Sequence, residues 1–242
     1  MTSITVTNPA TGAALGSVHD TTPAEAAALV ESAHMGFQAW RQSSPRHRAD
    51  VLMKAFTQMA DQKERLAGII SQENGKSLND AAAEVSYAAE FFRWYAEEAV
   101  RPAGDYSPAP AGGVRNIVTR HPVGVAVLIT PWNFPAAMAT RKIGPALAAG
   151  CSVLLKPAAE TPLTAFAIAD ILREAGVPEG VVHVAATTDA SGVVSAWLAD
   201  DRVRKLSFTG STQVGRILLG QCADRVLNTS MELGGNAPFI VT

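Results

Sequence analysis

Apolar residues follow two different spacings along this chain, and the change of spacing divides it. Over the first hundred residues they recur every three or four positions, as at Leu29, Ala33 and Phe37, which is typical of amphipathic helices. Thr-Pro and Ser-Pro pairs mark helix starts, and Gly75 marks a helix end. The pattern predicts an N-terminal helical region over residues 1–103, with helices beginning near residues 23, 45, 62 and 77.

The second spacing begins after residues 102–113, a stretch rich in proline and glycine. A strand is predicted at residues 114–119, and beyond residue 122 short uninterrupted apolar runs alternate with helical periods. Uninterrupted apolar strands are buried on both faces. The pattern therefore predicts an α/β fold, a Rossmann-like parallel sheet with helices on both faces, over residues 122–235. The expected strands are 123–130, 151–155, 181–185, 205–209, 229–233 and 238–242, and the expected helices are 135–149, 162–175, 191–198 and 212–223.

Composition excludes several classes of protein. The formal net charge of −2 over 242 residues gives no basic surface for nucleic acid. The longest apolar run, residues 123–130, is too short to span a bilayer, and no signal peptide precedes it, so we expect a cytoplasmic protein. Two cysteines, Cys151 and Cys222, form neither a disulfide framework nor a metal-binding pattern, and both are expected to be buried.

Polar, glycine and proline residues gather where the predicted strands end. Four such segments occur, at residues 130–135, 156–160, 208–212 and 232–235. Parallel sheets bind ligands at the carboxyl ends of their strands. The sequence thus predicts one site built from four loops.

The residue types in these loops leave their roles open. The turn from Gly210 to Gly215 opens a helix and suits a pyrophosphate, although Thr212 replaces the middle glycine of the usual fingerprint. Glu232 fits a ribose ligand, a general base or a surface carboxylate. Lys156 fits a ribose or phosphate ligand or a solvated strand end. Asn133 fits an oxyanion donor or a turn residue.

Taken together, the four loops resemble landmarks of the aldehyde dehydrogenase superfamily, in the family order and over essentially the whole chain. Residues 231–237, MELGGNA, resemble the family's glutamate signature, and PWNFP, KPA and FTGST resemble its other motifs. The resemblance implies that Glu232 is the general base, Asn133 the oxyanion donor and Lys156 the ribose ligand. It also implies a cofactor site, for NAD or NADP, formed by Thr130, Pro131, Trp132, Asn133, Lys156, Pro157, Ala158, Ala159, Gly210, Ser211, Gly215 and Leu233.

Within the superfamily the chain most resembles succinate-semialdehyde dehydrogenases. Residues 138–142 resemble a stretch in which an arginine, here Arg141, binds the substrate carboxylate. Many NAD-preferring relatives carry glutamate where this chain has Ala159, so we expect NADP to bind at least as well as NAD. Residues 104–121 resemble an arm that crosses to a neighbouring subunit, which implies a homo-oligomer in the full-length relative.

The family's nucleophilic cysteine, which forms the thiohemiacetal, has no counterpart in this chain. Residues 236–242 are expected to begin a catalytic domain that is otherwise absent, and the chain alone is expected to be inactive. One alternative is a non-catalytic nucleotide-binding or interaction module. Another is a dehydrogenase that uses Glu232 without a cysteine. A downstream reading frame that carries the cysteine segment would support an aldehyde dehydrogenase represented by its N-terminal half, whereas a natural stop with a stable protein would support the module. The other dehydrogenase is disfavoured because no other catalytic triad or Tyr/Lys pair is visible in the sequence.

Overall fold

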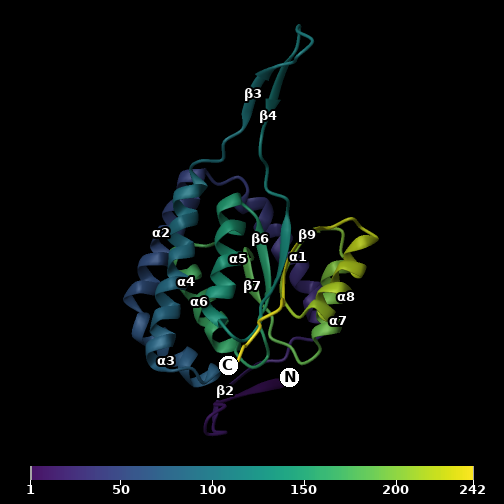
Figure 1. The fold of residues 1–242 in the computed structure, drawn as a ribbon. Coiled ribbons are helices and arrows are strands. Elements are labelled where there is room, and N and C mark those ends of the chain that lie inside the picture. The colour runs from purple at the N-terminus through teal and green to yellow at the C-terminus, as the bar shows by residue number, and fades with distance from the viewer. Residues whose placement is uncertain (1, 242) are drawn as a thin grey trace.

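A computed structural model describes residues 2–241. A five-stranded sheet in the order β7-β6-β5-β8-β9 forms its centre, and every pairing in that sheet is parallel. Helices cover both faces, which confirms the predicted α/β architecture (Figure 1). The elements are β1 Ser3–Thr7, β2 Ala14–His19, α1 Pro23–Trp40, α2 Pro45–Asp61, α3 Lys63–Asn74, α4 Leu78–Ala99, β3 Asp105–Pro108, β4 Arg115–Val118, β5 Val125–Ile129, α5 Pro135–Ala149, β6 Ser152–Lys156, α6 Pro162–Ala175, β7 Val182–Val184, α7 Ala190–Ala199, β8 Val203–Gly210, α8 Thr212–Ala223 and β9 Asn228–Leu233.

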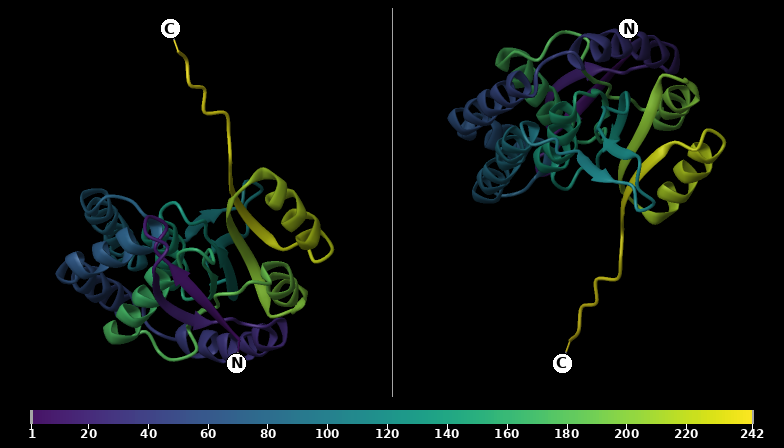
Figure 2. Two further views of the ribbon diagram at one scale, coloured as in Figure 1. Left: turned by 90° about the horizontal axis from the view of Figure 1, so that it is seen from below. Right: turned by 90° about the horizontal axis from the view of Figure 1, so that it is seen from above.

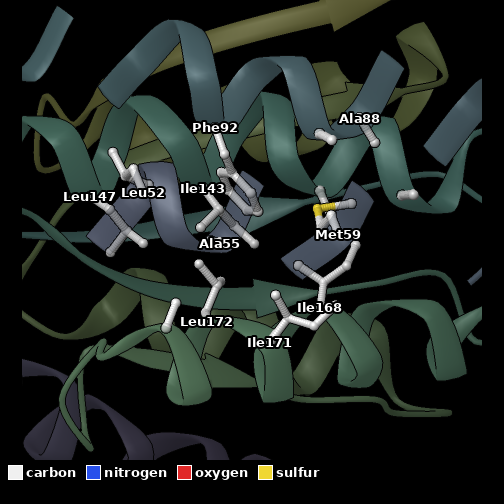
Figure 3. Close-up of a cluster of buried hydrophobic side chains, with 14 of the residues drawn as sticks. Leu52, Ala55, Met59, Ala88, Phe92, Ile143, Leu147, Ile168, Ile171 and Leu172 are labelled. Carbon is white, nitrogen blue, oxygen red and sulfur yellow. The ribbon is translucent and has the colours of Figure 1, made fainter. Parts of the chain in front are cut away.

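The central strand β5 is apolar throughout because both of its faces are covered. In β5 all five residues are buried, and alternate side chains enter two separate apolar clusters. Ala126 and Leu128 join the cluster formed with α2 to α6, whereas Val125 and Val127 join the cluster formed with α1, α7 and α8. Part of the first cluster, where Phe92 of α4 meets α2, α5 and α6, is shown in Figure 3.

The N-terminal region differs from the prediction at its beginning. Residues 3–19 form an antiparallel hairpin, β1 with β2, and not a helix. Ile4 and Val6 are buried between exposed neighbours, which is the two-residue period of a strand. Asn8 makes the turn, because its side chain accepts from the backbone N–H of Ala10 (2.9 Å) and Gly12 there has a φ of +71°.

The predicted last strand is wrong for the residues that can be checked. Residues 238–241 have no secondary structure, and residue 242 lies outside the described part. Figure 2 shows this segment leaving the body of the protein beyond β9. Apolar character alone does not make a strand, since a strand also needs a neighbour for its backbone hydrogen bonds.

A two-stranded antiparallel ribbon, β3 with β4, projects from the body before β5 begins (Figure 1). It leaves from the amino-terminal edge of the parallel sheet, so the four predicted site loops lie at the opposite edge. Within residues 2–241, every helix is too short or too polar to traverse a bilayer.

Two helical glycines provide a matched test of this packing. At Gly36 in α1, an added Cβ would meet the carbonyl carbon of Gly180 at 2.4 Å, whereas at Gly68 in α3 it would meet nothing within 4 Å. Gly68→Ala should raise the free energy of unfolding by up to about 1 kcal/mol through helix propensity. Gly36→Ala brings the same gain in helix propensity but should lower the free energy of unfolding, because the added Cβ would clash with Gly180. Urea denaturation measures both effects. Equal effects at both positions would contradict the close approach of α1 to the turn at Gly180.

Candidate functional site

The four predicted loops meet at the carboxyl edge of the sheet, as expected from parallel pairing. The register places Ile129 of β5 beside both Lys156 of β6 and Phe208 of β8. Phe208 in turn pairs with Met231 of β9, the residue before Glu232. With neighbouring strands about 4.8 Å apart, the strands of Lys156 and Glu232 are separated by roughly 14 Å. The two residues therefore flank this edge from opposite sides.

A groove of about 530 Å³ runs along the face of β8 and β9 that is turned toward α5. Arg141 and Lys142 of α5 line it together with Glu232. Strand alternation explains this placement, because Met231 and Leu233 pack against the apolar cluster on the opposite face of the sheet. The alternate side chains of β9, those of Asn228, Ser230 and Glu232, line the groove, which Met231 also borders.

Lys142 is a groove residue that the sequence argument missed. Its side chain is buried, and Nζ donates to Ser207 Oγ at 2.8 Å. Burial is the main cause that lowers the pKa of Lys142 to about 8, with smaller contributions from the charges of Arg141 and Lys205, whereas the carboxylate of Glu232 acts against this shift. The sequence did offer a sign of this burial, because Lys142 lies three residues after Ala139 on the apolar face of the helix. A charged residue on such a face is rarely buried without a partner.

Arg141 rests on aromatic side chains of α4. Its Nη2 donates to the hydroxyl of Tyr87 at 2.5 Å, and its guanidinium carbon lies 5.2 Å from the ring centroid of Phe91. Tyr87 and Phe91 themselves pack edge to face, with their centroids 5.0 Å apart. The guanidinium is therefore held at the groove and is not a freely solvated helix side chain.

Lys156 ends β6 with its side chain largely buried. Its Nζ donates to the carbonyl of Pro157 at 2.9 Å. Burial lowers the pKa of Lys156, and the carboxylate of Glu160 acts against that shift. The ammonium thus lies at the edge of the sheet, where only part of its hydrogen-bonding capacity is used by this carbonyl.

Close packing explains two glycines at the junction of β8 and α8, Gly210 at the end of β8 and Gly215 in the first turn of α8. A Cβ at Gly210 would meet the ring of Phe208 at 2.5 Å, and one at Gly215 would meet Leu233 Cδ2 at 2.6 Å. Ser211 is the N-cap of α8, where its Oγ accepts from the N–H of Val214 at 3.3 Å. The contact with Leu233 thus gives Gly215 a structural reason in addition to the cofactor role that the resemblance implies.

Asn133 lies on an exposed turn between β5 and α5, beside a second hollow of about 450 Å³. The hollow is lined from α4 by Glu84 and Tyr87 and from the turn by Asn133 and Phe134. The backbone carbonyl of Asn133 accepts from Lys76 Nζ at 2.8 Å. Asn133 and Glu232 thus share the carboxyl edge of the sheet, but Asn133 lines this hollow and Glu232 lines the groove.

A comparison with known proteins gives the family of the chain, because the sequence pattern of the aldehyde dehydrogenase family matches residues 1–242. The chain belongs to the aldehyde dehydrogenase family. It is 49% identical over 238 residues to the succinate-semialdehyde dehydrogenase [NADP(+)] GabD of Escherichia coli K12, covering 98% of this chain and 49% of that protein. It is 48% identical over 236 residues to 3-sulfolactaldehyde dehydrogenase of Pseudomonas putida, covering 98% of this chain and 48% of that protein.

Solved structures of the family agree with the fold. The succinate-semialdehyde dehydrogenase of Burkholderia pseudomallei superposes with a TM-score of 0.96 at 46% identity, over 100% of this chain and 50% of that one. The chain therefore spans about half the length of the relatives that it matches, and its fold is that of their N-terminal half.

Neither cysteine of this aldehyde dehydrogenase chain lies beside Glu232. Cys222 is buried in the cluster with α8, where burial raises the pKa of its thiol. Cys151 lines the same groove as Glu232, but it is buried and directly precedes β6, at the amino end of a strand whose carboxyl end carries Lys156. Both placements agree with the expectation that these thiols are structural.

The electrostatic link between Glu232 and Lys142 can be measured. Glu232→Gln should lower the pKa of Lys142 further below about 8, because the carboxylate that favours the ammonium is removed. A titration of the lysine Cε signals by NMR, assigned with Lys142→Met, reports this pKa. Glu160→Gln, outside the groove, is the control and should leave the pKa of Lys142 unchanged. An identical pKa of Lys142 with and without the Glu232 carboxylate would show that Glu232 does not face it.

The same pKa fixes the direction of a stability effect. Between pH 8 and 10.5 the unfolded chain keeps the proton of Lys142 and the folded chain loses it. The contribution of Lys142 to the free energy of unfolding should therefore rise with pH across this window. Urea denaturation at several pH values, compared with Lys142→Met, measures this contribution. A contribution that falls over the same window would contradict the lowered pKa.

Proposed function

We propose that this chain is the cofactor-binding half of an NAD(P)-dependent dehydrogenase that oxidises an aldehyde bearing an acid group, with succinate semialdehyde as the preferred substrate. The observation that carries the proposal is the groove that Arg141, Lys142 and Glu232 line together. A substrate with a carboxylate at one end and an aldehyde at the other needs a cation to bind the carboxylate and a base near the aldehyde. The groove would supply both in one cavity.

The names of the relatives support the acid group. One is a dehydrogenase of succinate semialdehyde and the other of 3-sulfolactaldehyde, so each acts on an aldehyde that also carries an anionic group. Arg141 is the residue proposed to bind this group, since a guanidinium can donate two parallel hydrogen bonds to a carboxylate. Tyr87, which already holds Nη2 of Arg141, would fix the direction of that fork.

The proposed cofactor site fits the groups that the chain offers. Relatives in the family use NAD or NADP. At the start of α8, the backbone N–H groups of Thr212 and Gln213 have no protein acceptor within the described residues, and they suit a pyrophosphate. Lys156 is proposed to donate to a ribose hydroxyl. The walls would be formed by Thr130, Pro131, Trp132, Pro157, Ala158, Ala159, Gly210, Ser211, Gly215 and Leu233.

Two residues of this chain are proposed to act on the reacting carbonyl. Asn133 would donate its side-chain amide to the oxyanion that develops on the aldehyde oxygen, a contribution of about 3 kcal/mol in other enzymes. Glu232 would accept the proton of the nucleophile or of the attacking water. When bound, the nicotinamide accepts the hydride from the aldehyde carbon. The nucleophilic thiol would come from outside residues 1–242, because Cys222 is buried in the cluster with α8, and Cys151, although it lines the groove, is buried at the amino edge of the sheet, away from Glu232.

The ribbon β3–β4 is proposed to join copies of the protein into a homo-oligomer. Tyr106 and Ile117, a register pair in this ribbon, are 66% and 70% exposed, and both strands have open edges. Apolar side chains on an open ribbon favour pairing with another chain.

Cofactor preference tests the proposed ribose site. Titration of the chain by calorimetry should give NADP an affinity at least equal to that of NAD. Ala159→Glu, three residues after Lys156, should weaken NADP relative to NAD by tenfold or more, about 1.4 kcal/mol, through repulsion of the 2′-phosphate. Ala159→Gln is the control of equal size and should have a smaller effect. A tenfold preference of the unmodified chain for NAD would overturn the NADP proposal.

Activity tests the proposed source of the thiol. The 242-residue chain should bind NADP but should not reduce it in the presence of succinate semialdehyde. Absorbance of the reduced nicotinamide gives the rate, and calorimetry on the same sample confirms that the cofactor site is intact. Turnover near the ordinary enzymatic rate of about 10 per second would show that a nucleophile lies within the chain.

A further inference from the structure

Three side chains from one short segment hold the main chain of the turn that carries Asn133. Asn74, the last residue of α3, donates from Nδ2 to the carbonyl of Trp132 at 2.8 Å. Lys76 donates from Nζ to the carbonyl of Asn133 at 2.8 Å. Glu84 of α4 accepts from the N–H groups of residues 136 and 137, at 2.8 and 3.2 Å. Residues 74–84 therefore fix both the turn and the start of the helix that follows it.

Glu84 takes the place of a missing helix cap. The N-cap of α5 is Phe134, whose side chain cannot accept a hydrogen bond, so the first N–H groups of this helix need another acceptor. The side chain of Glu84 has no exposed surface, and its negative charge lies at the positive end of the α5 dipole. A carboxylate buried in this way is stable only when it is paired.

Lys76 supplies that pairing and joins it to the turn. Its Nζ lies 2.5 Å from Glu84 Oε2, 2.8 Å from the carbonyl oxygen of Asn133 and 4.2 Å from the ring centroid of Phe134. One ammonium thus contacts a buried carboxylate, a backbone carbonyl and an aromatic face. Since the side chain of Lys76 is only 15% exposed, few other positions are open to it.

The side chain of Asn133 depends on this main-chain anchoring for its direction. Within residues 2–241, no protein group forms a hydrogen bond with the Asn133 side-chain amide, and Trp132, Asn133 and Phe134 are all exposed. An oxyanion donor must nevertheless be held to within about 0.5 Å of its working position. Contacts through the carbonyl oxygens are the means that the structure provides.

We propose that Lys76 and Glu84 are positioning residues for Asn133. The ion pair holds the turn through the Asn133 carbonyl and holds α5 through its first N–H groups, so the side-chain amide is preorganised toward the reacting carbonyl. The inference rests on the proposed function only in naming the carbonyl of the substrate as the group that Asn133 meets. The contacts that position Asn133 are all made by residues of this chain.

The test separates anchoring of the turn from overall stability. Lys76→Met leaves Glu84 buried without its cation, so this variant should lose stability as well as the contact with Asn133. The double variant Lys76→Met/Glu84→Gln removes both charges, and the amide oxygen introduced by Glu84→Gln can still accept from the helix N–H groups. The denaturation midpoint of the double variant should return toward that of the unmodified chain, while the contact with Asn133 remains lost.

Backbone order parameters from ¹⁵N relaxation supply the readout at residues 132–134. We expect values typical of rigid backbone, about 0.85, in the unmodified chain and below about 0.6 in the double variant. Unchanged order parameters in a folded double variant would overturn the proposal. NADP affinity, measured separately on the unmodified chain, tests the proposed function, so the two can fail independently.

Glu73 provides a matched control. It is also buried, and it accepts from the N–H groups of Leu163 and Thr164, at 2.7 and 2.9 Å, at the start of α6. It has no contact with the turn at Asn133 among the hydrogen bonds of residues 2–241. Glu73→Gln should alter stability through a helix N-terminus in the same manner and leave the order parameters at residues 132–134 unchanged. A loss of order there in this variant as well would assign the effect to general loosening.

Discussion

Burial of β5 on both faces is the constraint on which the rest of this structure depends. Each of its residues enters one of two apolar clusters, and Val153, Leu154 and Leu155 of the neighbouring β6 alternate between the same two clusters. A polar side chain on such a strand would lose its hydration without gaining a partner. Polar groups near β5 are therefore placed beyond its ends, and the common register brings the ends of β6, β5 and β8 to one level. The candidate site therefore begins at the carboxyl ends of the strands, where polar side chains are no longer enclosed by apolar clusters.

The buried charges follow from the same constraint. The helices α5 and α6 start directly behind the edge of the sheet, and neither Phe134 nor Thr161 caps them with its side chain. Their first N–H groups would be left without acceptors at a place from which water is excluded. Glu84 and Glu73, from the N-terminal helices, supply the acceptors. The N-terminal helical region is thus more than a cover for the sheet, because it completes the two loops that carry Asn133 and Lys156.

The sequence was informative where structure depends on local pattern. The expected helices 135–149 and 212–223 agree with α5 and α8 in both bounds, since proline, glycine and serine mark their ends. Residues 3–19 were misassigned, because a short hairpin offers few alternating positions, and residues 238–241 were misassigned because periodicity cannot reveal a missing neighbour. The contacts of Glu84 with α5 and Glu73 with α6 span 52 and 91 residues. No spacing rule reaches that far. The four loops could be placed from sequence, but the residues that brace them could not.

Charge in the groove gives a physical reason for the acid group of the proposed substrate. Arg141, Lys142 and Lys205 line it, and Glu232 is the acidic residue among its lining side chains. Lys205 donates to Asn228 and Ser230, and Lys142 donates to Ser207. Among the residues that the structure describes, Arg141 donates only through Nη2, to Tyr87, so the other donors of its guanidinium are the ones best placed to meet a ligand. An aldehyde without a charge would leave this excess of positive charge uncompensated. In the proposed function, a second carboxylate held at Arg141 would balance this charge and direct the carbonyl toward the end of the groove that Glu232 occupies.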